Sequence, residues 1–229
     1  MTTTAQTDEP ATARRGTGGP PLWAPAVAYA ALTVAGVATF TGVRPDAPPA
    51  AVLATQQAAP VLGAISALLL FASAAPLAVW SAAVFQRLQV LGVRVAGPVI
   101  GLVGGVLAAV AVGASGLVAA TAVAVAPGGD AGVAAALAQL AFLAGGPGFA
   151  VPFALLLAGV AVPALILRLV PRWLAVTGIV LAGIGVLATL TVAVLAAAPA
   201  LPVVRFGGLL WLVAVSVSLP RRRHRTTTA

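Results

Sequence analysis

Long apolar runs follow one another along this chain, each about long enough to cross a lipid bilayer. An α-helix rises 1.5 Å per residue, so about 20 apolar residues cross a hydrocarbon core of about 30 Å. Asp and Glu are absent between Asp46 and Asp130 and again after Asp130. Only 7% of the residues are charged, too few to cover the surface of a soluble domain. The sequence therefore predicts an all-α fold, an integral membrane helical bundle.

Arginines and Pro- and Gly-rich turns divide the apolar part, residues 23–220, into predicted spans. The fourth apolar stretch is too long for one straight crossing and too short for two, since only about 14 residues precede its Gly-Pro break. Pro and Gly weaken a helix, so we predict one long fourth span that is kinked at this break. The six predicted transmembrane helices cover about 23–43, 60–85, 97–126, 133–167, 173–197 and 203–220.

Polar tails are predicted at both ends of the chain. Residues 1–22 are rich in Thr, Pro and Gly and have a composition that builds no core, so we expect a disordered tail. Residues 221–229 form a short basic tail. Its arginines, Arg221 to Arg225 around His224, are expected to act as a cytoplasmic anchor or to bind anionic lipid headgroups.

The arginines indicate on which side of the membrane each loop lies, since cytoplasmic loops are enriched in Lys and Arg. With six crossings, two of the twelve arginines, Arg44 and Arg205, fall on one side and the other ten on the side of both termini. We therefore expect both termini to be cytoplasmic. All twelve basic residues are Arg in a chain rich in Ala, Gly and Pro, which favours a GC-rich bacterial genome and hence the plasma membrane.

Several kinds of chemistry are disfavoured. The chain has no Cys, and its one His, His224, lies in the basic tail. Carboxylates, which ion-coupled pumps and metal sites usually need, are absent from the predicted spans, so we expect no metal site and no cofactor. The stretch Gly113-Ala114-Ser115-Gly116 matches a short intramembrane-protease signature, but Ser115 lacks a predicted general base. We expect its hydroxyl to bond a helix carbonyl instead.

The Gly-Pro break in the fourth span is the main candidate for a functional site. Broken helices expose carbonyl groups and open cavities in transporters, whereas the simpler alternative is a structural kink. Gln139 precedes the break and is the most polar side chain of that span. The candidate residues are Gln139, Gly145, Gly146, Pro147, Gly148 and Pro152.

Arg205 is the charge that fits the hydropathy pattern least, because a full last span must begin before it. It is expected either to extend to the lipid headgroups or to form an ion pair with Asp46 or Asp130 on the outer face. Elsewhere, Gly101 and Gly105 form a small-xxx-small pattern that is typical of closely packed membrane helices.

Motifs along the chain resemble those of a bacterial family of multi-pass membrane proteins known as domain of unknown function 4386. The resemblance covers about residues 23–220 and implies six helices and no established activity. It rests on Pro76-Leu77-Ala78-Val79, Arg94-Val95-Ala96-Gly97-Pro98, Gly145-Gly146-Pro147-Gly148-Phe149-Ala150-Val151-Pro152, Pro171-Arg172-Trp173-Leu174-Ala175 and Arg205-Phe206-Gly207-Gly208.

Three functional hypotheses follow. The first is a non-enzymatic membrane protein that acts as a scaffold or binds a protein partner, a second copy of itself or lipid. The alternative is a small facilitator or transporter with a cavity at the break between Gly145 and Gly148. A membrane enzyme is a third hypothesis and would need Ser73 or Ser115 to converge with Arg205. Nucleic-acid binding is not expected, because no basic face interleaved with aromatic residues is present.

Overall fold

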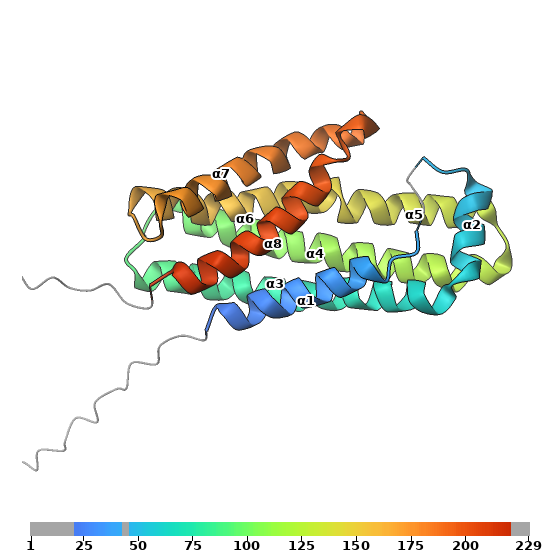
Figure 1. Ribbon diagram of the computed structural model, residues 1–229, viewed down its shortest axis with the longest axis horizontal. Helices are drawn as coiled ribbons and strands as arrows, with labels where there is room; N and C mark the ends of the chain where they lie inside the picture. The colour runs from blue at the N-terminus through green and yellow to red at the C-terminus, as the bar shows by residue number, and fades with distance from the viewer. Residues whose placement is uncertain (1–20, 43–45, 221–229) are drawn as a thin grey trace, which may run out of the picture.

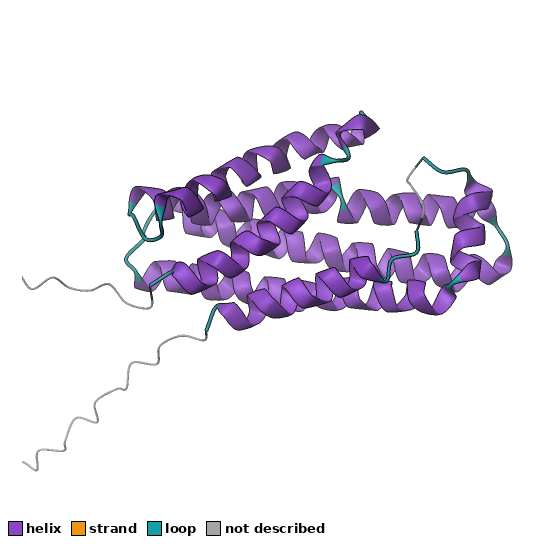
Figure 2. Cartoon of the chain, viewed as in Figure 1, coloured by secondary structure: helices purple, strands orange, loops and turns teal. Residues whose placement is uncertain are grey.

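The computed structural model describes residues 21–42 and 46–220, and these residues form helices joined by short turns (Figure 2). No strand occurs within these two ranges, so the all-α prediction is confirmed for them. The predicted tails, as well as Arg44, lie outside the described residues apart from Pro21 and Leu22. The helices are α1 (Trp23–Ala38), α2 (Pro49–Ala58), α3 (Pro60–Val90), α4 (Ala96–Val125), α5 (Ala131–Gly145), α6 (Pro147–Ile166), α7 (Arg172–Leu187) and α8 (Ala200–Ser218).

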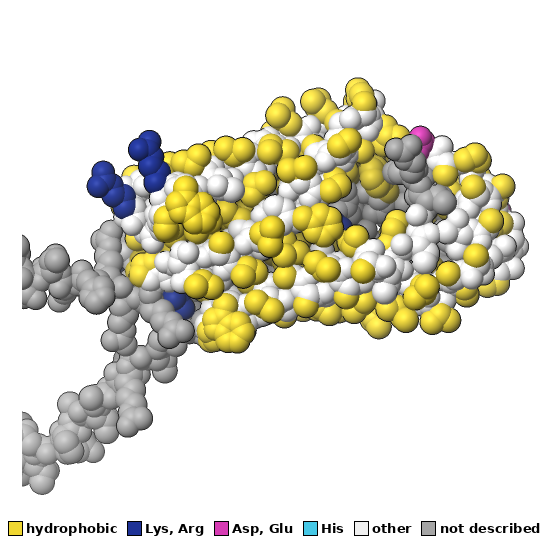
Figure 3. All heavy atoms as spheres, viewed as in Figure 1, with side chains coloured by type: hydrophobic (Ala, Val, Ile, Leu, Met, Phe, Trp, Pro, Cys, Tyr) yellow, Lys and Arg dark blue, Asp and Glu magenta, His cyan; other side chains and the backbone are white. Residues whose placement is uncertain are grey.

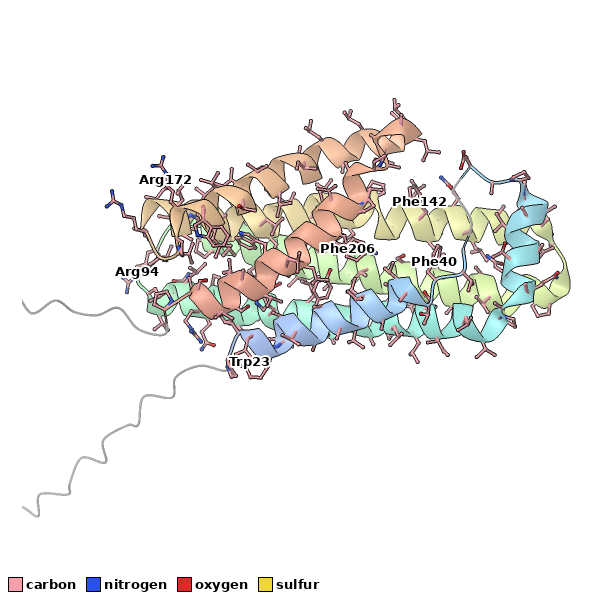
Figure 4. All side chains as sticks on the ribbon, in the orientation of Figure 1. Trp23, Phe40, Arg94, Phe142, Arg172 and Phe206 are labelled. Carbon is pink, nitrogen blue, oxygen red and sulfur yellow. The ribbon has the colours of Figure 1, made fainter. Side chains whose placement is uncertain are left out.

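The helices lie side by side in a long bundle, with α4 at its centre (Figure 1). α4 packs against α3, α5 and α6, while α1 packs against α3, and α7 and α8 cover the side of α6. The described chain begins and ends at the same end of the bundle. Arg94 and Arg172 also lie there, and we call it the arginine end (Figure 4). The opposite end, which α2 covers, is the α2 end.

Five helical segments of the described chain are long and apolar enough to cross a membrane: 60–90, 96–128, 131–166, 172–192 and 195–218. α1 is apolar but shorter, with 16 residues. Hydrophobic side chains cover much of the side of the bundle, as lipid-facing helices require (Figure 3). These features are compatible with a multi-pass membrane protein.

Helix boundaries differ from the predicted spans in several places. α1 ends at Ala38 rather than near residue 43. Residues 49–58, expected as part of a loop, form α2, which begins with Pro49 at its first position, where a missing N–H costs nothing. α7 ends at Leu187, about three turns before the predicted end of the fifth span, and tighter 3₁₀ turns (Ala188–Val192 and Leu195–Ala197) follow. α3 continues to Val90 rather than ending near residue 85.

Glycines bring α4 and α6 into close contact. A Cβ atom added to Gly159 would lie 2.6 Å from the carbonyl oxygen of Gly97, and one added to Gly104 would lie 2.6 Å from the nitrogen of Leu156. Gly101 faces the backbone of Gly159 as well, whereas Gly105 faces Ser81 in α3. The two glycines of the predicted small-xxx-small pattern therefore pack against different helices, Gly101 against α6 and Gly105 against α3. Such approach of backbones gives dispersion contacts that lipid tails cannot replace.

Candidate functional site: a cavity at the α5–α6 break

The helix is interrupted at Gly146, between the last residue of α5 and the first of α6. Gly146 has φ −91° and ψ −102°, which is not helical, and Pro147 has no N–H to continue the hydrogen-bond ladder. The N–H of Phe149 donates to Gly146 O (3.2 Å) instead of Gly145 O, the acceptor that a continuous helix would use. The break therefore leaves the Gly145 carbonyl without a helical donor.

Arg205, on the first turns of α8, donates a hydrogen bond to this carbonyl. Its Nη2 donates a hydrogen bond to Gly145 O, and its guanidinium carbon lies 4.9 Å from the centroid of the Phe149 ring. A cation beside the last carbonyl of α5 also interacts favourably with the negative end of that helix dipole. Phe149 in turn stacks on Phe153, with 4.8 Å between the ring centroids. The break, α6 and α8 are thus joined at one point.

Ser115 in α4 donates a hydrogen bond to a second carbonyl near the end of α5. Its hydroxyl donates to Ala141 O at 2.8 Å. Gly145 lies against the same side chain, because a Cβ atom on Gly145 would be 3.0 Å from Ser115 Cβ and closer still to its Oγ. Glycine at position 145 is therefore required by the approach of α4, not only by the break.

A cavity of about 470 Å³ lies beside the break and opens to the surface of the bundle. Figure 3 shows a hollow toward the α2 end, with a basic side chain, dark blue, at its bottom. Arg205 is the basic residue that lines this cavity. Three phenylalanines that line it, Phe40, Phe142 and Phe206, come from three parts of the chain and lie around the same region (Figure 4). We call this the break cavity.

Apart from Arg205 and Ser115, the polar side chains that line the break cavity are two glutamines and the hydroxyl residues Thr41, Thr55 and Ser66. Gln139 and Gln56 line it from α5 and α2, and the Oε1 atom of Gln56 is buried without a hydrogen-bond partner. The neighbouring Gln57 donates to Ala126 O at 2.8 Å, which ties α2 to the end of α4. α2 therefore forms part of the cavity wall at the α2 end.

Two buried hydroxyl groups of α1 lie on the helix face that turns toward the bundle. Tyr29 is 1% exposed and Thr33 is fully buried, and neither hydroxyl oxygen has a hydrogen-bond partner among the described residues. α1 therefore carries two buried polar groups on the side that faces the bundle.

Only some of the predicted site residues line the break cavity. Gln139, Gly145 and Gly146 line the break cavity, whereas Pro147 is buried, Gly148 is exposed, and neither lines it. Pro152 lies further along α6, where its carbonyl oxygen faces Gly104.

The predicted outer-face residues are also separated. Asp130 caps α5 by accepting a hydrogen bond from the N–H of Val133, and Asp46 is exposed. Within residues 21–42 and 46–220, no ion pair joins Arg205 to either aspartate.

Sequence reasoning identified Arg205 and the break separately and did not connect them. α2 was not expected in the site, and no sequence signal points to it. Phe149 ends the predicted Gly-Gly-Pro-Gly-Phe break, but its contact with Arg205 was not expected. Ser115 was expected to bond a helix carbonyl, and it does so across helices, to α5 rather than within α4. The Gly-x-Ser-Gly stretch was therefore a useful signal of a close helix contact.

The described residues hold no cluster of three His, Asp or Glu side chains that would suit a metal ion. The part of the break cavity that is described is lined by no carboxylate or imidazole, so its chemistry is one cation, a few neutral polar groups and a large apolar wall. Comparisons with protein-family models, curated proteins and solved structures found no match to this chain.

Proposed function

We propose that this protein is a multi-pass membrane protein that binds a small amphiphilic molecule in the break cavity. One observation carries the proposal: a cation on a membrane-length apolar helix lines a cavity whose wall is otherwise mostly apolar. Ligand sites are typically concave and apolar with a few well-placed polar groups, and their volumes of about 300–1,000 Å³ include that of this cavity. Ionisable residues within a membrane bundle usually mark such sites.

The proposal includes six crossings with both termini in the cytoplasm of a bacterial cell. α1 is about 24 Å long at 1.5 Å per residue and needs only a few flanking residues to complete a span. α5 and α6 count as one crossing, kinked at Gly146. The exposed Arg94 and Arg168 lie on loops, and the exposed Arg172 is the first residue of α7. Their position at the arginine end supports its placement on the cytoplasmic side. We also propose that the chain belongs to the family of domain of unknown function 4386, whose motifs it resembles.

Binding is favoured over catalysis because the site has no proton acceptor suited to activating a nucleophile. The hydroxyl of Ser115 is 2.8 Å from Ala141 O and donates to it. A serine nucleophile needs a general base within hydrogen-bond reach, and the described lining offers none. Ser115 and Arg205 do line one cavity, but as donors to carbonyl groups.

Binding of a neutral amphiphile to the purified protein tests this proposal. A dansyl-labelled medium-chain alcohol, titrated into nanodiscs that contain the protein, should show saturable fluorescence enhancement beyond that of empty nanodiscs. Ala138→Trp, which places a large ring in the cavity wall, should weaken binding about tenfold or more, or about 1.4 kcal/mol. Val110→Trp on the exposed side of α4 is the control and should bind like the unmodified protein.

Equal binding by the unmodified protein and Ala138→Trp, or enhancement no larger than in empty nanodiscs, would contradict the proposal. The variants must first elute as single species of the same size, so that a loss of binding reports on the cavity rather than on unfolding.

A facilitator is the second candidate, because the cavity lies at a helix break of the kind that transporters use. It predicts that liposomes containing the protein exchange the dansyl alcohol between leaflets faster than protein-free liposomes. Unchanged exchange together with saturable binding would favour a binding protein without transport.

A further inference from the structure

The position of Arg205 along α8 places its charge where burial is energetically unfavourable. Ser218, the last residue of α8, is about 20 Å further along the helix at 1.5 Å per residue, and a bilayer core is about 30 Å thick. If the arginine end of α8 lies at one boundary of the core, Arg205 lies inside the core. A guanidinium there needs partners for its charge and its hydrogen-bond donors.

The described partners of Arg205 leave most of its donors unused. A guanidinium has five N–H donors in a fixed planar fork. One donates to Gly145 O, one face of the group contacts the Phe149 ring, and no further hydrogen bond joins Arg205 to a described residue. Because Arg205 also lines the break cavity, a molecule in the cavity has access to this group.

The described residues offer little negative charge to neutralise Arg205. The chain has four acidic residues, and two of them, Asp46 and Asp130, are described. Neither forms an ion pair with Arg205, and Asp130 is used as the cap of α5. The positive end of the α6 dipole begins at the break and adds to the attraction for an anion.

We infer, on the basis of the proposed function, that the ligand is a single-chain carboxylic acid, a long-chain fatty acid. Its carboxylate binds the Arg205 guanidinium, and its hydrocarbon chain lies along the apolar wall near Phe40, Phe142 and Phe206. The planar fork of an arginine matches the two oxygens of a carboxylate, so two parallel hydrogen bonds form.

Charge and volume select this ligand among anionic lipids. A carboxylate carries one negative charge, which one guanidinium neutralises, whereas a phosphate monoester carries about −1.5 to −2. The cavity volume of about 470 Å³ holds roughly fifteen groups of the size of a water molecule, at ~30 Å³ each. This is enough for much of one acyl chain.

Competition against the dansyl alcohol tests the inference. Palmitic acid, hexadecanol, methyl palmitate and a lysophosphatidic acid with the same chain are compared as competitors on the unmodified protein, Arg205→Gln and Arg94→Gln. We expect palmitic acid to compete at least tenfold better than hexadecanol or the methyl ester. Arg205→Gln should remove this difference, whereas Arg94→Gln, an exposed arginine at the arginine end, should keep it.

The outcomes separate this inference from the proposed function. If the dansyl alcohol shows no saturable binding, the proposed function fails. If it binds, but acid and alcohol compete equally on the unmodified protein, only the inference fails. Stronger competition by lysophosphatidic acid than by palmitic acid would overturn the carboxylate assignment. The ratio of acid to alcohol is measured on the unmodified protein, so the test holds even if Arg205→Gln does not fold.

Discussion

At the scale of single residues, small side chains and buried donors determine how close the helices lie. Gly104 and Gly159 let the backbones of α4 and α6 approach so closely that neither position has room for a Cβ atom. Two tryptophan N–H groups join distant helices: Trp80 donates to Ser216 Oγ and Trp211 donates to Leu174 O, both at 2.7 Å. The core of the bundle is therefore specified by a few individual contacts.

Gly159→Ala is expected to destabilise the protein strongly. The added Cβ meets backbone atoms of Gly97 and Gly101, which cannot rotate away, so α4 and α6 must separate. Overpacking of this kind costs about 1–3 kcal/mol. Thermal unfolding in detergent should show a lower midpoint. The control is Gly183→Ala in α7, where a Cβ meets nothing within 4 Å; it should leave the midpoint unchanged or raise it, because Ala favours helix.

Ser216→Ala is expected to lower stability by about 1–3 kcal/mol, because it leaves the buried N–H of Trp80 without its acceptor. Thr177→Ala removes an exposed hydroxyl that bonds only within α7, to Trp173 O, and serves as the control. Thermal unfolding of both variants checks the prediction. A midpoint for Ser216→Ala equal to that of Thr177→Ala would show that the Trp80 bond adds no stability.

At the scale of helices, the break between α5 and α6 and the short helix α2 shape the cavity. The break frees Gly145 O for Arg205, and α2 lines the cavity wall where Gln57 holds it to the end of α4. α2 was not expected from the sequence, because residues 46–59 are rich in Pro and less hydrophobic than the spans around them. Helix formation there depends on neighbouring elements, since a segment of ten residues is marginal alone.

Pro147→Ala is expected to make α5 and α6 more continuous, because it restores an N–H that donates to the carbonyl of residue 143. Hydrogen exchange of the amides in residues 142–150 should become slower, and binding of the dansyl alcohol should weaken as Arg205 loses Gly145 O. Pro76→Ala, within α3 and away from the cavity, is the control and should leave exchange in 142–150 unchanged. Equally fast exchange in Pro147→Ala would mean that Pro147 does not maintain the break.

At the scale of the whole molecule, the arrangement of charge indicates an orientation. Arg94 and Arg172 lie at the arginine end with both ends of the described chain, and α2 lies at the opposite end (Figures 1 and 4). The break cavity lies toward the α2 end (Figure 3). The proposed orientation, with the arginine end in the cytoplasm, predicts that the cavity lies in the outer half of the membrane and that the proposed ligand enters from that side.

Single cysteines test this orientation, since the chain has no Cys of its own. Gly128→Cys lies at the α2 end and should react with an impermeant thiol reagent in intact cells, because a side chain there meets nothing within 4 Å. Val95→Cys lies in the exposed turn before α4, at the arginine end, and should react only after the cells are opened. The reverse labelling pattern would place both termini outside.

The sequence by itself determined the all-helical fold of the described residues and the position of the break. Both depend on local features: runs of apolar side chains for the helices, and the missing N–H of Pro147 for the interruption. Only the tertiary structure decided which side chains donate hydrogen bonds to the carbonyls at the break. Ser115 and Arg205 lie 26 and 60 residues away in the chain from their acceptors, Ala141 and Gly145. Contacts over such separations depend on helix packing, which the glycines of α4 and α6 permit and which hydropathy does not encode.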